Sequence, residues 1–179
     1  MMARLFSAVA LAGTLVGILA CRDHGSLEWE AVKTAIRSDY PTVSHVSTEE
    51  LAYWLQQGDP VVLIDARKHE EYAVSHLTGA KRASNVEEAR AALEGVTLNS
   101  PVVVYCSVGY RSSALVRDIE DLGFTKVFNL EGSIFQWANE GRSVYRDGMK
   151  VEVVHPYDSK WGELLDRVLW WIPSEGSLD

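Results

Sequence analysis

The residues with the clearest chemical potential in this sequence are a cysteine and an arginine in one short loop. An apolar run ends at Cys106, a polar loop with one glycine follows, and a helical pattern begins near Arg111. The thiolate of a cysteine is its nucleophilic form, and a free cysteine with a pKa of about 8.5 is mostly protonated at neutral pH. A loop that lowers this pKa would make Cys106 a reactive group.

The composition of this loop favours a thiolate at Cys106. Gly109 accepts backbone angles that other residues avoid, so the loop can curl and turn its N–H groups inward. The helix that follows adds the positive end of its dipole, worth about 0.3–1 kcal/mol at an exposed position. Because one pKa unit corresponds to about 1.4 kcal/mol, the loop N–H groups and Arg111 must supply much of the effect.

A plainer interpretation makes Cys106 a small apolar side chain at the end of a buried strand, as buried cysteines often are. That interpretation would be preferred for an isolated cysteine. Gly109 and Arg111 follow in the same strand-to-helix loop, however, and this combination favours a chemical role.

The elements that must position this loop can be predicted from the hydrophobic pattern. Short apolar runs predict buried strands at residues 61–64, 102–105 and 126–130. Spacing and caps predict helices from Ser47 to Gly58, at 68–73, at 86–93 with Asn85 or Ser84 as cap, through Leu115, Ile119 and Leu122, and at 133–139. This alternation predicts an α/β fold with a parallel sheet flanked by helices on both faces. Asp65 and Cys106 would then lie at the carboxyl ends of strands, where such sheets form their active crevices.

Three ordered stretches resemble the motifs of rhodanese domains. Residues 106–112, C-S-V-G-Y-R-S, resemble the family's active-site loop C-x-x-G-x-R-S. Residues 65–80, D-A-R-K-H-E-E-Y-A-V-S-H-L-T-G-A, are similar to D-(V/A)-R-x-x-x-E-(Y/F)-x-x-G-H-I-x-G-A. Residues 129–137, N-L-E-G-S-I-F-Q-W, are close to N-L-x-G-G-x-x-x-W. Ser75 and Ser133 stand where that family usually has glycine.

The resemblance covers residues 44 to about 146 and implies a rhodanese-like sheet and the transfer of a sulfane sulfur. The cysteine would take the outer sulfur of thiosulfate or of a persulfide, hold it as a persulfide, and pass it to cyanide, a thiol or a protein acceptor. The implied catalytic residues are Cys106 and Arg111, and the implied substrate-binding residues are Ser107, Val108, Gly109, Tyr110 and Arg111. The resemblance implies no metal and no organic cofactor.

Four further residues are expected to support the site, namely Asp65, Arg67, Glu71 and His76. An ion pair between Arg67 and Glu71 that pins the loop is favoured over a site floor made by Asp65 and Arg67. The resemblance implies that His76 is structural. The other histidines lack ligand spacing and no second thiol lies beside Cys106, so a zinc site is not expected.

The N-terminal residues have the pattern of a targeting segment. Leu5 to Ala20 carries no charge, which is short for a membrane span of about 20 residues but suits a secretory signal. Residues 18–21, I-L-A-C, resemble a bacterial lipobox, which implies lipidation of Cys21. A cleaved signal peptide and an uncleaved anchor are the alternatives, and all three predict an extracytoplasmic protein, periplasmic or held at the membrane. Since Cys21 and Cys106 are the only cysteines, a lipidated Cys21 would leave Cys106 without a disulfide partner.

The predicted domain plan has four parts: a signal peptide at 1–21, a linker at 22–43, a rhodanese domain at 44–147 and an extension at 148–179. The extension is predicted to contain an amphipathic helix over 159–172, with its apolar face formed by Trp161, Leu164, Leu165, Val168, Leu169 and Ile172. Acidic residues offset the basic ones on this segment, so packing on the domain or on a partner is favoured over binding to a bilayer.

Charge and loop length separate the remaining function classes. The chain has 25 acidic and 17 basic residues and no basic cluster, so no nucleic-acid partner is expected. Cysteine-dependent phosphatases have a longer loop than the four residues between Cys106 and Arg111. A non-catalytic module that carries or senses persulfide at the membrane is a further alternative, but inactive rhodanese-like domains usually lack the cysteine. A sulfurtransferase is therefore the prediction.

Overall fold

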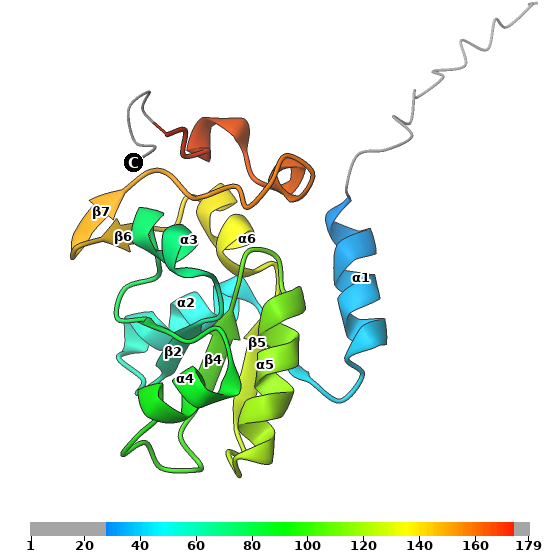
Figure 1. Cartoon of the computed structure of the whole chain (residues 1–179), viewed down its shortest axis with the longest axis vertical. Helices are drawn as coiled ribbons and strands as arrows, with labels where there is room; N and C mark the ends of the chain where they lie inside the picture. Colours follow the sequence, from blue (N-terminus) through cyan, green and yellow to red (C-terminus); the bar gives the residue numbers. More distant parts are fainter. Residues whose placement is uncertain (1–27, 174–179) are drawn as a thin grey trace, which may run out of the picture.

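The structure is a computed structural model that describes residues 28–173 (Figure 1). The predicted signal segment and Cys21 lie outside these described residues. Within residues 28–173, none of the helices combines the length and the apolar character that crossing a bilayer requires.

A five-stranded parallel sheet forms the centre of the molecule, as the apolar runs predict. Its strands lie in the order β1 (Ser44–Val46), β5 (Val127–Leu130), β4 (Val102–Tyr105), β2 (Val62–Asp65) and β3 (Lys81–Arg82). The register pairs Asp65 with Tyr105, so the ends of β2 and β4 lie side by side. Cys106 directly follows the central strand β4, whose side chains are all buried.

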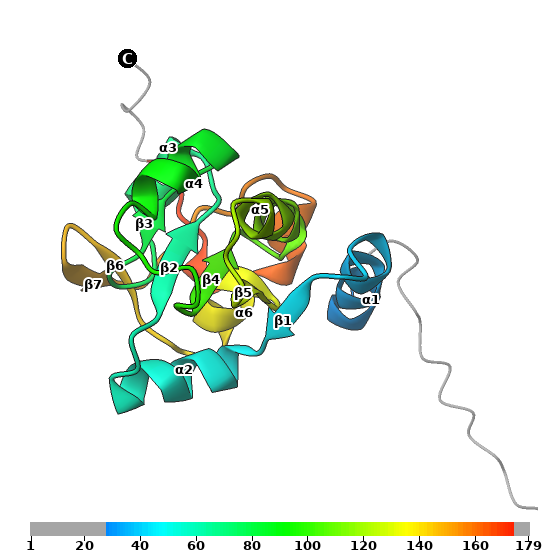
Figure 2. The same ribbon diagram turned by 90° about the horizontal axis from the view of Figure 1, so that it is seen from below.

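Helices cover both faces of this sheet, which confirms the predicted α/β architecture (Figure 2). The helices are α1 (Trp29–Asp39), α2 (Thr48–Gln57), α3 (His69–Val74), α4 (Val86–Ala92), α5 (Tyr110–Asp121) and α6 (Ser133–Asn139). Side chains from α1, α2 and α6 share one apolar cluster with Leu63 and Val103. Side chains from α4 and α5 share the other with Ile64 and Val104, because successive side chains of a strand point to opposite faces.

Two helix starts follow their predicted caps. The Ser47 hydroxyl accepts a hydrogen bond from the Glu50 N–H at 3.0 Å, and Gly58, with a φ of 76°, caps the C-terminus of α2. Asn85, not Ser84, caps α4 by accepting from the Glu88 N–H at 2.9 Å.

The predicted linker at 22–43 is wrong over part of its length, because residues 29–39 form α1. Val32 and Ile36 lie one helical turn apart and are buried in the same cluster as the sheet residues Val46 and Leu130. Trp29 packs against the same cluster, so α1 is attached to the domain through its apolar side chains although polar residues surround them in the sequence. Figure 1 shows α1 standing beside α5.

The predicted amphipathic helix at 159–172 is also wrong. The chain instead forms two short 3₁₀ helices, Trp161–Leu164 and Arg167–Leu169, after a hairpin of β6 (Val144–Arg146) and β7 (Met149–Val151). The side chain of Asn139 breaks the helical pattern, since its Nδ2 donates to the Leu164 carbonyl at 2.8 Å and its Oδ1 accepts from the Asp166 N–H at 2.9 Å. The segment does pack on the domain, with Leu164 and Leu165 buried.

Candidate active site around Cys106

The loop from Cys106 to Gly109 connects β4 to α5 at the carboxyl edge of the sheet. Cys106 is 1% exposed. Gly109 has a φ of 127°, a conformation that side chains with a Cβ rarely adopt. A Cβ there would also lie 3.0 Å from Cδ1 of Ile36, so α1 fills the space behind the loop.

The start of α6 fixes the orientation of this loop. The N–H groups of Ile134 and Phe135 donate to the carbonyls of Cys106 and Ser107, each at 3.2 Å. The Ser133 hydroxyl accepts from the Cys106 N–H at 3.1 Å and donates to the Leu130 carbonyl. First-turn N–H groups of a helix lack partners within the helix, so they are free to hold other carbonyls. The two loop carbonyls are thereby engaged by α6 and are not directed at the sulfur.

The sulfur of Cys106 accepts hydrogen bonds from the loop and from α5. The Gly109 N–H donates to Sγ at 3.1 Å, and the Ser112 hydroxyl lies 3.4 Å from it. Burial raises the pKa of the Cys106 thiol, but the charge of Arg111 and the hydrogen bonds from Ser112 and Gly109 outweigh it. The net effect lowers this pKa below its ordinary value, which favours the nucleophilic thiolate.

Arg111 is held in place by a buried carboxylate. Its Nη1 and Nη2 atoms lie 2.6 and 2.8 Å from the oxygens of Glu71, and Nη2 also donates to the Ser107 hydroxyl at 2.9 Å. Glu71 has 1% of its surface exposed and accepts a further bond from the Lys68 N–H at 3.1 Å. Burial raises the pKa of the Glu71 carboxyl, but the bonds and charge of Arg111 hold it below its ordinary value.

The predicted ion pair between Arg67 and Glu71 is wrong. Arg67 pairs with Asp65 through Nη2 and Oδ2 at 2.7 Å, and both side chains are fully buried. Its Nη2 also donates to the Ser75 carbonyl. The planar guanidinium of Arg67 matches the geometry of the Asp65 carboxylate, which lies two residues away at the end of β2. Glu71 is therefore free of Arg67 and pairs with Arg111.

His76 contacts residues other than those around the sulfur. Its ring stacks on Tyr72 with a centroid distance of 4.0 Å, and Nδ1 lies 3.1 Å from the Tyr72 carbonyl. Its backbone N–H donates to the Tyr145 carbonyl at 2.8 Å. These contacts tie α3 to β6.

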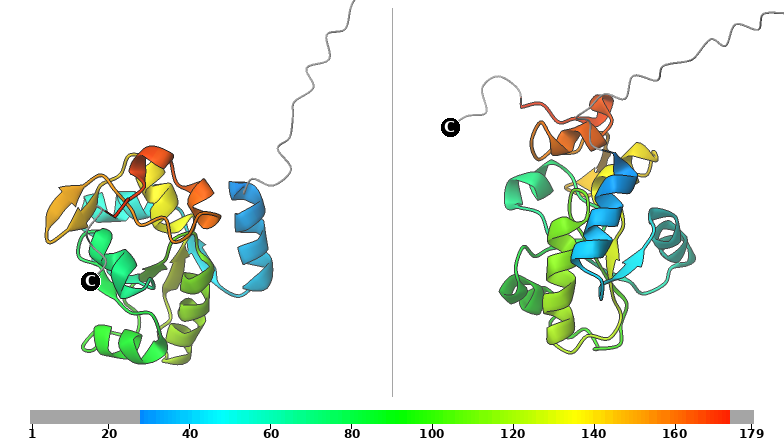
Figure 3. Two further views of the ribbon diagram at one scale, coloured as in Figure 1. Left: turned by 45° about the horizontal axis from the view of Figure 1, so that its top comes forward. Right: turned by 90° about the vertical axis from the view of Figure 1, so that its right-hand side faces the viewer.

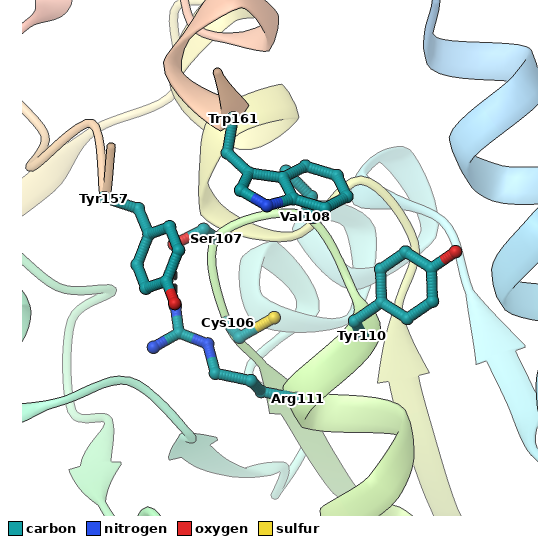
Figure 4. A pocket seen from close by; sticks show the side chains of 7 residues that line it. All are labelled: Cys106, Ser107, Val108, Tyr110, Arg111, Tyr157 and Trp161. Atoms are coloured by element: carbon teal, nitrogen blue, oxygen red, sulfur yellow. Dashed lines mark hydrogen bonds between the residues drawn. The ribbon is translucent and has the colours of Figure 1, made fainter. Parts of the chain in front are cut away.

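A cavity of about 140 Å³ opens in front of the sulfur. Its walls are formed by Cys106, Ser107, Val108, Tyr110, Arg111, Tyr157 and Trp161 (Figure 4). The last two come from the C-terminal segment, which lies over α6 and the reactive loop (Figure 3). The Tyr157 ring covers the Arg111 guanidinium at 4.7 Å, and Trp161 meets the Tyr110 ring edge-on at 5.8 Å.

The sequence did not indicate several of these residues. Ser112 lies in the quoted loop motif and Asn129 opens the third motif, so position in a motif was a signal for both. The Ser112 hydroxyl donates to Asn129 Oδ1 at 2.6 Å, and Asn129 Nδ2 lies 3.1 Å from His45 Nδ1. Tyr157 and Trp161 lie in no motif. Trp161 was predicted only as part of the apolar face of a C-terminal helix, and no pattern in the sequence marked Tyr157.

No metal centre is present among the side chains of residues 28–173, where no three His, Cys, Asp or Glu residues gather closely enough to bind an ion. The chemistry offered by the described residues is that of a shielded cysteine with a lowered pKa beside a paired arginine.

Comparison with known proteins points to one family. A family model described as "Rhodanese-like domain" matches residues 47–140. The thiosulfate sulfurtransferase GlpE of Pseudomonas fluorescens is 33% identical over 76 residues, which cover 42% of this chain and 69% of that protein. The tRNA uridine(34) hydroxylase of Cupriavidus necator is 32% identical over 122 residues, which cover 62% of this chain and 43% of that protein.

A solved structure agrees with the fold. The thiosulfate sulfurtransferase of Pseudomonas aeruginosa superposes with a TM-score of 0.57 at 19% identity, covering 74% of this chain and 26% of that one. Two other curated relatives are matched over 25% and 51% of their own length, so this chain spans about half of them or less.

Proposed function

Because this chain belongs to the rhodanese-like domain family, we propose that it is a sulfurtransferase that carries a sulfane sulfur on Cys106. The donor is thiosulfate or a persulfide, and the acceptor is cyanide or a thiol. The observation that carries the proposal is the surroundings of Sγ, a buried sulfur that receives the Gly109 N–H at 3.1 Å and has its pKa lowered.

The proposed reaction has two displacements. The Cys106 thiolate attacks the outer sulfur of thiosulfate, the S–S bond breaks, and sulfite leaves with the electron pair. The anionic persulfide on Cys106 then transfers its terminal sulfur to the acceptor nucleophile, which restores the thiolate. No electrons enter or leave the overall exchange.

The described residues suit both steps. N–H groups of a curled loop can hold the negative charge as it moves from Sγ to the terminal sulfur. Engagement of the Cys106 and Ser107 carbonyls by α6 removes repulsive oxygens from this position. Arg111 supplies a positive charge near the sulfur, and Glu71 fixes where that charge lies.

The arrangement favours sulfur transfer over phosphate ester hydrolysis. A phosphatase arginine must direct its donors at the phosphoryl oxygens, whereas both Nη atoms of Arg111 are bonded to Glu71. The short loop between Cys106 and Arg111 is also better suited to one sulfur than to a group with several oxygens.

The test is an intact mass measurement on the full chain carrying Cys21→Ser, purified in detergent. Incubation with thiosulfate, or with an organic persulfide, should add one sulfur atom, and cyanide should remove it. The matched variant Cys106→Ser should gain no sulfur. A stable sulfur adduct in Cys106→Ser, or no adduct with either donor, would contradict the proposal.

A further inference from the structure

The entrance to the sulfur is built from two distant parts of the chain. Tyr110 belongs to the start of α5, whereas Tyr157 and Trp161 belong to the C-terminal segment. We call these three residues the aromatic rim. Figure 4 shows the sulfur of Cys106 directed toward the space that Tyr110 and Trp161 enclose, with the Arg111 guanidinium beneath Tyr157.

The rim is preformed. The backbone N–H of Trp161 donates to Asp158 Oδ1 at 2.8 Å, which fixes the chain at the residue that carries the indole. A Cβ on Gly162 would lie 2.5 Å from the Trp170 ring, so Trp170 packs directly on the backbone next to Trp161. An apolar group that enters such a pocket gains contacts without a large cost for ordering the wall.

The polar side of the cavity offers little free binding capacity to an anion. The guanidinium of Arg111 is already bonded to Glu71 and Ser107 and covered by Tyr157. These bonds engage three of its five N–H groups, so an anionic donor reaches only the remaining N–H groups unless it displaces the buried carboxylate. A thiolate on Cys106 repels a dianion such as thiosulfate further.

The cavity as a whole has room for about one ring. A cavity of about 150 Å³ lined by apolar side chains holds benzene, and this cavity measures about 140 Å³. Val108 and the aromatic rim supply apolar contact surface at its mouth. Burial of apolar surface is therefore the larger source of donor affinity that this pocket provides.

We propose that the aromatic rim makes Cys106 select sulfane-sulfur donors whose leaving group carries an aromatic or other apolar substituent. This inference rests on the sulfurtransferase function proposed above. For a thiosulfonate donor, R–SO₂–S⁻, the Cys106 thiolate attacks the outer sulfur and the S–S bond breaks. The sulfinate R–SO₂⁻ leaves with the electron pair, and the Cys106 persulfide anion keeps the second negative charge.

The test compares benzenethiosulfonate with methanethiosulfonate. The two donors have the same charge and the same reacting sulfur, and they differ only in the group R, a phenyl ring or a methyl group. The ratio of their kcat/KM values, with cyanide as acceptor, is divided by the ratio of their rates with N-acetylcysteine to remove intrinsic reactivity. We expect the full chain with Cys21→Ser to favour the benzene donor by about tenfold, the factor that about 1.4 kcal/mol produces.

Tyr157→Ala and Trp161→Ala should each lower this normalised ratio toward one. The control Tyr53→Ala removes a tyrosine that is 59% exposed on α2, away from the cavity, and should leave the ratio unchanged. Because both donors are measured on one preparation, a smaller folded fraction cancels from the ratio. Tyr157 is itself 40% exposed, so its replacement tests the rim even where Trp161→Ala unfolds.

The experiment distinguishes a failure of the proposed rim from a failure of the proposed sulfurtransferase function. A ratio near one in the parent chain, or a high ratio that Tyr157→Ala leaves intact, would overturn the role of the rim while leaving sulfur transfer standing. Absence of a persulfide with both donors would overturn the sulfurtransferase function and this inference with it.

Discussion

At the scale of single residues, the reactivity of Cys106 results from a balance between burial and charge. Burial opposes the thiolate, and the Arg111 charge is the largest of the effects that favour it. Glu71 holds that charge in place and also accepts the Ser107 hydroxyl at 3.1 Å. The state of the sulfur therefore depends on a carboxylate that positions the main stabilising charge, although the hydrogen bonds to Sγ come from Gly109 and Ser112.

The first prediction concerns this charge. Arg111→Ala should raise the pKa of Cys106, because the burial cost remains and the favourable charge is lost. The thiolate is present above the pKa, so the rate of iodoacetamide alkylation should reach half its maximum at a higher pH than in the parent. Persulfide formation at pH 7 should fall by about tenfold or more.

Glu71→Gln provides the opposite test of the same charge balance. It removes the carboxylate that neutralises Arg111, so the alkylation midpoint should move to lower pH. Alkylation profiles that coincide in the parent, Arg111→Ala and Glu71→Gln would show that these charges do not reach the sulfur.

At the scale of elements, the reactive loop is held between two helices. The start of α6 binds the loop carbonyls, and Ile36 of α1 lies against Gly109. Ser133, at the position where a glycine is usual, has a φ of 51° and uses its hydroxyl on the Cys106 N–H. The departure from the motif therefore brings a hydrogen bond as well as a strained backbone.

The second prediction compares two glycines with positive φ. Gly95→Ala, with a φ of 77° and nothing within 4 Å of the new Cβ, should lower the free energy of unfolding by about 1–2 kcal/mol. Gly109→Ala adds an overpacked contact with Ile36, so it should cost about 1–3 kcal/mol more. Urea unfolding measures both, and equal losses would contradict the packing of α1 on the loop.

The parts of the fold that the sequence predicted are those whose signals are local. Apolar runs marked β2, β4 and β5, and the cap residues Ser47 and Asn85 marked helix starts. The partner of Glu71 could not be found in this way, because Arg111 lies 40 residues further along the chain. The spacing of Arg67 and Glu71 suggested a local pair, but burial beside Asp65 decided the outcome.

The prediction of a helix in the C-terminal segment failed for a related reason. Its apolar residues fit helical spacing, but the two hydrogen bonds that Leu164 and Asp166 make with the Asn139 side chain, and the bridge between Val154 and Trp170, impose another path. Val168 consequently points into solvent with 85% of its surface exposed, although the helical pattern assigned it to the apolar face. Tertiary partners outweighed the periodicity.

At the scale of the whole molecule, the site depends on parts outside residues 47–140. The helix α1 precedes that range, and Tyr157 and Trp161 follow it. Arg37 also pairs with Glu131 at 2.6 Å, which ties α1 to the turn before α6. The flanking segments therefore enclose the sulfur that the central domain carries.

The third prediction tests how the C-terminal segment is attached. Asn139→Ala removes both hydrogen bonds to Leu164 and Asp166 and should lower the free energy of unfolding by about 1–3 kcal/mol. Hydrogen exchange at residues 157–170 should quicken, while exchange in β4 stays slow because that strand is buried. Unchanged exchange in the segment would show that other contacts hold it.

The position of the rim residues in the sequence has a consequence for the growing chain during synthesis. A ribosome completes the loop of Cys106 well before it adds Tyr157 and Trp161, since the latter stand far downstream. A growing chain thus passes through an interval in which the thiol exists without the aromatic walls of its pocket. The donor selectivity that we propose for the rim requires Tyr157 and Trp161, so a nascent chain that ends before residue 157 carries the thiol without that selectivity.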